Sequence, residues 1–387
     1  MKLLPFDYAA RNAGRNPVRT LLMTGGIMAV VFLVILMGAF VESMASTIRS
    51  TGEPENIMVV GQGSENFVEQ SEISPSVPGI LSASLQNIAT LHGHPLISPE
   101  IMHSAMVQLP GEPEPENPHK VLVRGVTKDA FLVHSQVYLT EGRAPGPGEI
   151  VVGALAGTRL DLPESALQVG KKLQFENEQW TISGKFSAPG TAFDAEIWAP
   201  LQELLIQTKR DTYSSVVVRM QSAKDFSDVD MFVKRRLDLE LAAVPEVTYY
   251  AGLAKFFRPV QIMGWVMAGL IVISGLFGGL NVMLAAIAAR TRELACLETL
   301  GFSRRAIVIA LLQESLLQAG AGTLLSLGLA LALLSGTAVR FTMGAVALEL
   351  TPPVLAAGVA CGLALAVIGT LVPAIRFARR PLIDQLR

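Results

Sequence analysis

The sequence has little of the charge that soluble proteins carry on their surfaces. Only 17% of its 387 residues are Asp, Glu, Lys or Arg, whereas half are hydrophobic; a typical soluble domain has about 25% charged residues. Two cysteines are too few for a disulfide scaffold, and a net charge of −2 argues against the basic surface of a nucleic-acid-binding protein. The composition therefore indicates a membrane protein that carries a water-soluble part.

Motifs of several kinds of active site are also missing. The sequence contains no Gly-x-x-x-x-Gly-Lys-Ser/Thr run to hold nucleotide phosphates and no Gly-x-Ser-x-Gly turn. No cysteine or close acidic residue accompanies the histidines to complete a metal site, so we interpret all five as solvated loop residues: His92, His94, His103, His119 and His134. We expect no metal, no cofactor and no catalytic residue in this chain.

What the sequence does contain is four apolar runs long enough to cross a bilayer. Each exceeds the ~20 residues that ~30 Å of hydrocarbon requires. The predicted spans are residues 21–45, 256–289, 306–339 and 351–376. The second run is longer than a bilayer needs and is expected to continue outside the membrane as a stalk.

Basic residues are concentrated in three short segments: residues 1–20, 290–305 and 377–387 together with Arg376. These hold twelve bases and four acids, whereas residues 42–258 hold 18 bases and 27 acids. Because short cytoplasmic segments are enriched in Lys and Arg, we expect both termini and residues 290–305 to be cytoplasmic. The large insert and a short loop at 340–350 would then lie on the outer side of the membrane.

The insert, residues 46–255, is too polar to lie in lipid and has strand and helix patterns of its own. Strands are expected at residues 56–61, 121–126, 149–153, 180–184 and 214–219. Helices are expected at residues 79–91, 199–208 and 223–243. The predicted fold is therefore a membrane protein with four transmembrane α-helices, one before and three after a large extracytoplasmic α+β domain.

Glu314 is the one charged residue away from the ends of a predicted span, since Glu42, Arg258 and Arg376 lie near span ends. A carboxylate in a membrane is costly and is a functional candidate by default. Two interpretations stay open: a structural anchor paired with Arg304 or an N-terminal arginine, or a relay for protons or substrate.

The segment between the second and third spans predicts a short amphipathic helix. Leu294, Leu297, Leu300 and Gly301 share one helical face, whereas Arg292, Glu293 and Arg304 lie elsewhere. Mixed charge argues against binding to anionic lipid, which favours basic residues without acids. We therefore expect this face to meet a protein partner.

Several motifs together resemble the MacB/FtsX-like ABC-transporter permeases, the mechanotransmission class. They are Thr291-Arg-Glu-Leu294, Leu300-Gly-Phe-Ser-Arg-Arg305 and Leu312-Gln-Glu-Ser315, with Ala10 to Leu22 at the start, Pro373 to Arg387 at the end, and Glu141 to Gly153 and Val169 to Leu173 in the insert. The resemblance covers the whole chain, with one span before the insert and three after it.

The resemblance implies a permease that forms a homodimer or heterodimer and pairs with two separate ATPase subunits, which would bind ATP and Mg. It assigns the contacts with the ATPase to Arg292, Glu293, Leu294, Leu300, Gly301 and Arg304, with Leu297 on the same face. Gly301 would end the helix in the left-handed conformation. A periplasmic adaptor or lipoprotein carrier is a further possible partner.

Three functions stay open at this stage. The first is export or extraction of an amphiphile, peptide, lipid or lipoprotein, driven by ATP. The second is an FtsX-like signalling role that transports nothing and controls a cell-wall hydrolase. The third is a sensor that signals inward when it binds a ligand.

Overall fold

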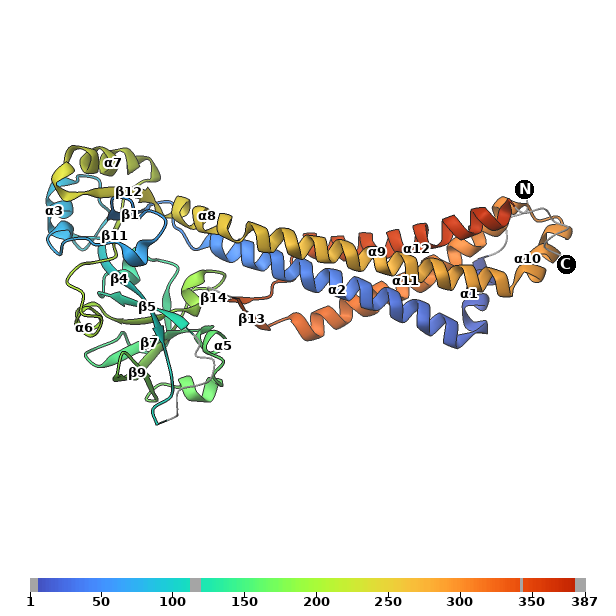
Figure 1. Ribbon diagram of the computed structural model, residues 1–387, viewed down its shortest axis with the longest axis horizontal. Coiled ribbons are helices and arrows are strands. Elements are labelled where there is room, and N and C mark those ends of the chain that lie inside the picture. Colours follow the sequence, from blue (N-terminus) through green and yellow to red (C-terminus); the bar gives the residue numbers. More distant parts are fainter. Residues whose placement is uncertain (1–5, 112–119, 342–343, 380–387) are drawn as a thin grey trace. The chain divides into compact units, whose positions relative to one another are not determined.

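The computed structural model describes residues 6–111, 120–341 and 344–379, which form two units (Figure 1). The helical unit contains residues 1–42, 259–337 and 348–387, and the inserted domain contains residues 43–258 and 338–347. His119, residues 1–5 of the N-terminal segment and residues 380–387 of the tail lie outside the described residues.

Among the described residues, four helices are long and apolar enough to cross a membrane. They are α2 (Pro17–Ser50), α9 (Arg258–Ala289), α11 (Arg304–Leu334) and α12 (Pro352–Ala378), and two shorter helices accompany them, α1 (Phe6–Arg15) and α10 (Thr291–Thr299). The last residues of α2, from Ser43, belong to the inserted domain. The chain thus has one such helix before the inserted domain and three after it.

The helix ends differ from the limits of the predicted spans, because capping residues and glycine decide where a helix begins and ends, whereas hydropathy decides only which residues are apolar. Asn16 caps α2, since its Oδ1 accepts the N–H of Arg19 at 3.2 Å, and Pro17 occupies the first turn, where its missing N–H costs little. α11 ends at Leu334, five residues before the predicted limit, because Gly336 takes a φ of 77° and a strand begins at Ala338.

Small residues let the helices of the helical unit approach closely. A Cβ on Gly322 of α11 would lie 2.7 Å from the carbonyl oxygen of Thr24 in α2, and one on Gly362 of α12 would lie 2.1 Å from Oγ1 of Thr323 in α11. Such contacts stabilise helix packing where lipid removes the hydrophobic driving force.

The inserted domain is built on a mixed sheet, of which ten strands lie in the described residues. The strand order is β12-β1-β11-β4-β5-β10-β7-β9-β6, with β8 also paired to β9. Most neighbours are antiparallel; β5 with β10 and β7 with β9 are parallel. The bounds are β1 Asn56–Gly61, β4 Ile97–Met106, β5 Lys120–Val126, β6 Tyr138–Gly142, β7 Glu149–Gly153, β8 Lys172–Phe175, β9 Glu178–Ser187, β10 Ile197–Pro200, β11 Ser215–Arg219 and β12 Leu241–Pro245.

Helices cover both faces of this sheet, so its central strands are buried on both sides. In β1, Ile57 and Val59 belong to the larger hydrophobic core, whereas Met58 and Val60 belong to a smaller one on the other face. The helices are α3 Val77–Ser84, α4 Ala130–Val133, α5 Ala156–Leu160, α6 Leu201–Gln207, α7 Phe226–Arg235 and α8 Glu246–Phe256.

The five predicted strands are confirmed, while two of the three predicted helices are too long. Helix α3 ends at Ser84, and the chain then forms a small hairpin of β2 (Thr90–Leu91) and β3 (His94–Pro95). Helix α7 ends at Arg235, and residues 241–245 form edge strand β12 instead. In both cases strand pairing overrides an apolar spacing that also fits a helix.

The predicted loop between the last two spans is a β-hairpin in the structure. Strands β13 (Ala338–Phe341) and β14 (Gly344–Ala347) pair antiparallel and pack against α5 and the turn at residues 192–195. Ala345 and Val346 are buried there, and Nη1 of Arg340 lies 4.0 Å from Oδ2 of Asp161. The segment that joins α11 to α12 is therefore part of the inserted domain.

Candidate functional site

Helix α10 ends in a tight turn that fixes its orientation. The N–H of Gly301 bonds to the carbonyl of Glu298 at 3.0 Å, and the N–H of Phe302 bonds to that of Leu297 at 3.2 Å. Gly301 has a φ of 90°, which a residue with a Cβ adopts only with strain. This is the Schellman pattern of a helix C-terminus, and it confirms that Gly301 ends the helix.

The structure separates the leucines that the sequence places on one face. Leu294 is 3% exposed and packs in a hydrophobic cluster with residues of α2, α9, α11 and α12, and Leu297 and Phe302 pack against the same cluster. Leu300 is 73% exposed, because the backbone leaves the helical path at this C-cap position. The expectation that Leu294 contacts a partner directly is therefore corrected: its side chain faces the chain's own helices.

The charged residues near α10 are exposed or make contacts at the surface. Nη1 of Arg15 lies 3.4 Å from Oε2 of Glu293. Arg304 donates to Oε1 of Glu298 at 2.6 Å and to the carbonyl of Ala378 at 2.8 Å, which joins the start of α11 to the end of α12. Arg292 is exposed. Around Leu300, the chain thus presents one apolar side chain among charged ones.

Glu314 is buried and joins three other parts of the helical unit. Its carboxylate accepts hydrogen bonds from Arg19 of α2 and from Nδ2 of Asn12 in α1, and Nη1 of Arg290 lies 3.4 Å away. The predicted pairing with an N-terminal arginine is confirmed, whereas Arg304 pairs with Glu298 instead. These contacts favour the anchor interpretation, since the buried carboxylate lies between Arg19 and Arg290 and so joins α11 to α2 and to the residue before α10.

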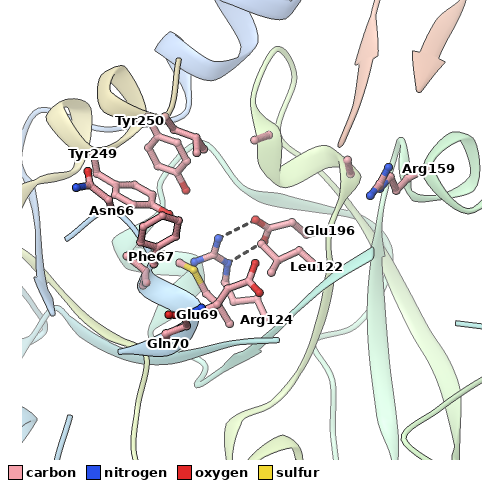
Figure 2. A pocket seen from close by; sticks show the side chains of 15 residues that line it. Asn66, Phe67, Glu69, Gln70, Leu122, Arg124, Arg159, Glu196, Tyr249 and Tyr250 are labelled. Atoms are coloured by element: carbon pink, nitrogen blue, oxygen red, sulfur yellow. Dashed lines mark hydrogen bonds and ion pairs between the residues drawn. The ribbon is translucent and has the colours of Figure 1, made fainter. Parts of the chain in front are cut away.

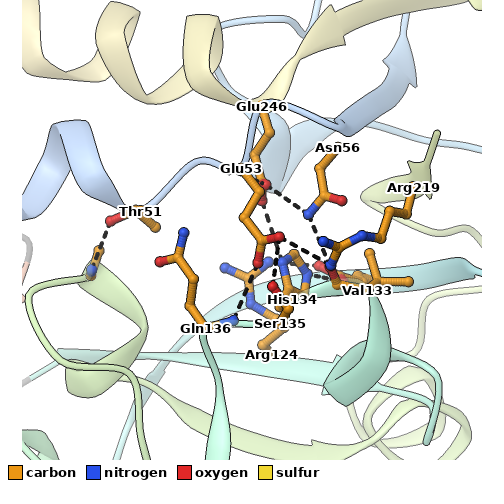
Figure 3. A network of polar contacts seen from close by, with 12 residues as sticks. Thr51, Glu53, Asn56, Arg124, Val133, His134, Ser135, Gln136, Arg219 and Glu246 are labelled. Atoms are coloured by element: carbon orange, nitrogen blue, oxygen red, sulfur yellow. Dashed lines mark hydrogen bonds and ion pairs between the residues drawn. The ribbon is translucent and has the colours of Figure 1, made fainter. Parts of the chain in front are cut away.

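A second polar cluster lies in the inserted domain, where α2 ends and α8 begins (Figure 3). Oε2 of Glu246 accepts the backbone N–H of Glu53 at 3.0 Å and Nδ2 of Asn56 at 2.9 Å. The carboxylate of Glu53 lies 3.0 Å from Nη1 of Arg219 and accepts from Ser135 at 2.9 Å. The end of the first long helix is thereby fastened to the first residue of the helix that leads into α9.

His134 and Arg124 extend this polar cluster toward the centre of the sheet. Nε2 of His134 lies 2.7 Å from Oε1 of Glu100, and Nδ1 lies 3.4 Å from Oε1 of Glu246. Arg124 donates to Glu100 at 2.7 Å and makes two bonds of 2.7 Å to Glu196. We name these eight residues the junction network: Glu53, Asn56, Glu100, Arg124, His134, Glu196, Arg219 and Glu246.

The charged groups of the junction network shift one another's pKa values. Burial alone would raise the pKa of Glu100, but His134 and Arg124 hold that pKa at about 2. Burial would lower the pKa of His134, and the carboxylates of Glu100 and Glu246 outweigh it and raise the pKa. Burial raises the pKa of Glu246, because the opposing effect of His134 is smaller. Removing one member would leave an uncompensated charge in the core.

The interpretation of His134 as a solvated loop residue is wrong. Its side chain is 1% exposed, bonds to Glu100, and lies with its ring centroid 4.9 Å from that of Phe193 at a tilt of 56°. His92 and His94 are exposed, and His103 bonds to Glu176 at 2.8 Å. Within the described ranges, no group of three or more His, Cys, Asp or Glu side chains is placed to hold a metal ion.

Two family profiles match the sequence in tandem. The MacB-like periplasmic core domain matches residues 20–236, more than half of the chain, and the FtsX-like permease C-terminal region matches residues 265–382. No protein of curated function matches the sequence.

Solved structures of two extracytoplasmic regions are similar to part of the chain. The periplasmic region of MacB from Actinobacillus actinomycetemcomitans has 12% identity and a TM-score of 0.39, over 53% of this chain and 95% of that one. The extracellular domain of the noncanonic ABC-type transporter YknZ from Gram-positive bacteria has 11% identity and a TM-score of 0.37, over 49% of this chain and 99% of that one. On the two matching profiles, this chain belongs to the MacB/FtsX-like family of ABC-transporter permeases.

Proposed function

We propose that this chain is the permease subunit of an export or extraction machine in a bacterial inner membrane. Its cargo would be an amphiphile, a peptide, a lipid or a lipoprotein. Separate ATPase subunits would bind ATP and Mg and hydrolyse the nucleotide. The excess of basic residues near the span ends supports cytoplasmic termini and a cytoplasmic α10, with the inserted domain outside.

The observation that carries this proposal is the geometry of the turn after α10. Leu294 and Leu297 fasten the helix to its own bundle, and the Schellman turn holds Leu300 outward with no cover from the described residues. An exposed leucine on a rigid turn between two spans suits insertion into a partner's cleft, because burial of one leucine contributes about 1.5–3 kcal/mol. Arg292, Glu293, Gly301 and Arg304 would form the rim of that contact.

Force on α10 would reach α2 through the contacts of Glu314. Arg290 directly precedes α10, and it shares the carboxylate of Glu314 with Arg19 near the start of α2. Because α2 continues without a break from Arg19 to Ser50, a displacement at Arg19 would be transmitted along about 47 Å of helix.

At its far end, α2 enters the junction network. Oγ1 of Thr51 accepts the N–H of Ala192 at 2.8 Å, while Glu53 is bonded to Glu246. Glu246 begins α8, and only Phe257 separates α8 from α9. The network would therefore hold the C-terminal end of α2 and the start of α8 together. These two segments, which connect to the first and second spans, would move as one part of the inserted domain.

We further propose that the chain works as a dimer of permeases with two ATPase subunits. Large apolar side chains of α9 are exposed in this single chain, and they would meet lipid or the second permease: Val260, Ile262, Met263, Trp265, Val266, Met267, Leu270, Ile273 and Phe277. A periplasmic adaptor or a lipoprotein carrier would complete the path outside.

Reconstitution with an ABC ATPase subunit from the same organism tests the proposal. In proteoliposomes, ATP hydrolysis should accompany release of a bound amphiphile or lipoprotein to the outside. ATP hydrolysis with no released species, together with activation of a bound cell-wall hydrolase, would instead establish the signalling role.

A further inference from the structure

A cavity of about 280 Å³ lies in the inserted domain beside α8 (Figure 2). Its apolar wall is formed by Tyr249, Tyr250 and Leu253 of α8, by Phe67 and by Met102 and Leu122 of the sheet. Three aromatic rings therefore surround a volume near the lower end of the ~300–1,000 Å³ typical of ligand pockets. The volume suits one ring-sized group and is too small for the acyl chains of a lipid.

The inner end of the cavity is polar but electrically balanced. Two arginines and two glutamates line the cavity: Arg124, Arg159, Glu69 and Glu196. Arg124 and Glu196 bond to each other twice, and Arg124 also bonds to Glu100. Since the Arg124 guanidinium group is already shared by two carboxylates, an anion would gain little there, and a cation would meet Arg124. The cavity thus favours an uncharged group.

One polar atom of the wall lacks a partner. Tyr250 is 4% exposed, and its hydroxyl makes no hydrogen bond with any residue that the structure describes. Figure 2 shows this hydroxyl directed into the space above Arg124 and Glu196. Burial raises the pKa of Tyr250, so the group stays protonated and can donate. A hydroxyl that faces a cavity can bond to a water molecule or to a ligand that replaces the water.

We propose that this cavity binds the aromatic group of a small uncharged amphiphile, whose polar atom bonds to the Tyr250 hydroxyl. Aromatic rings favour edge-to-face or offset contacts with the three rings of the wall. Because the site includes three residues of α8, an occupant touches the helix that continues into α9. The role of this ligand as cargo rests on the proposed function, whereas the binding itself does not.

Indole is a suitable probe, since it is one aromatic system with a single N–H group. The described part of the inserted domain contains no cysteine, so Leu253→Cys in a Cys296→Ser background places a single reporter on the cavity wall. In the full chain in nanodiscs, indole should slow maleimide labelling of this cysteine and saturate with a Kd on the order of 0.1 mM, as nine non-hydrogen atoms allow. Leu237→Cys, on an exposed part of the same domain, is the matched control and should show no protection.

Tyr250→Phe tests the hydrogen bond while it keeps the ring. It should weaken protection roughly fivefold, the factor expected for one neutral hydrogen bond. The proposal would be overturned by any of three results. Indole could leave the labelling of Leu253→Cys unchanged, it could protect Leu237→Cys equally, or its affinity could be unchanged in Tyr250→Phe. The assay contains no ATPase, so its failure leaves the proposed permease function untouched, and failure to recruit an ATPase leaves this result untouched.

Discussion

The carboxylate of Glu246 accepts the backbone N–H of Glu53 at 3.0 Å, although the two residues are 193 positions apart in the sequence. Glu53 follows the helix of the first span, and Glu246 begins the helix that leads to the second. This bond joins the place where the chain enters the inserted domain from the first span to the place where it leaves for the second. Most of its neighbours in the junction network are buried and charged, so the joint resists separation.

Gly52 allows the close approach on which this joint depends. A Cβ at Gly52 would lie 2.7 Å from both Cα and N of Val247, and backbone atoms there cannot move aside. We expect Gly52→Ala to lower the free energy of unfolding of the inserted domain by about 1–3 kcal/mol. Thermal unfolding followed by circular dichroism measures this. Gly252→Ala, in α8 with no atom within 4 Å of the added Cβ, should leave stability unchanged or raise it.

The stability of the inserted domain should fall as pH rises above the ordinary pKa of histidine. The pKa of His134 is raised because Glu100 and Glu246 outweigh burial, so its stabilising effect is complete below pH ~6.5 and is lost as pH rises through the folded-state value. Arg124 is the other charged group that influences the imidazole, and it opposes this rise.

His134→Gln tests that assignment. It should destabilise the domain by roughly 3 kcal/mol at pH 6, since it leaves Glu100 and Glu246 with one charged partner fewer. The decline in melting temperature between pH 6 and 9 should also disappear in this variant. The surface variant His103→Gln is the control, and a decline that persists in His134→Gln would exclude His134 as its source.

Glu314→Leu should destabilise the helical unit by about 3–5 kcal/mol, because Arg19 and Arg290 would remain with no carboxylate between them. Thermal unfolding in nanodiscs measures the loss. Glu293→Gln breaks a half-exposed ion pair with Arg15 and should cost less than about 1 kcal/mol. Equal losses in the two variants would contradict the anchor role of Glu314.

Cys296 reports on the orientation of α10 without any substitution. It is exposed on α10, and the other cysteine, Cys361, is buried in α12. In intact cells, an impermeant maleimide should label Cys296 only after the membrane is permeabilised, whereas Leu237→Cys should be labelled at once. Labelling of Cys296 in intact cells would place α10 outside and exclude contact with a cytosolic ATPase.

The spans and most strands could be predicted because each depends on a local pattern. Long uncharged runs and short apolar segments bounded by glycine can be recognised from consecutive residues alone. Gly301 likewise indicates a helix end, because glycine adopts a positive φ without strain. Strand pairing partners do not follow from a local pattern, which is why the sequence predicts a helix at residues 241–243 and a loop at residues 340–347, where the structure has β12 and most of the β13–β14 hairpin.

The junction network could not be predicted, since its members come from seven separated segments. One local signal was present: Arg124 lies within the apolar run Val121–Val126, where a charge requires a buried partner. The sequence did not identify that partner. The spacing of Leu294, Leu297 and Leu300 predicts one shared face, but Leu300 lies at the C-cap outside the helix, and only packing decides that the first two face inward.

The most direct test of the permease assignment is recovery of an ABC ATPase with the chain carrying Leu300→Asp. Leu237→Asp is the matched control, because Leu237 is 76% exposed and Leu300 is 73% exposed, so neither substitution disturbs a core. Leu300→Asp should lose the ATPase during purification while the inserted domain keeps its melting temperature, and Leu237→Asp should retain it. Recovery of the ATPase with both variants at the level of the unsubstituted chain would contradict coupling through α10.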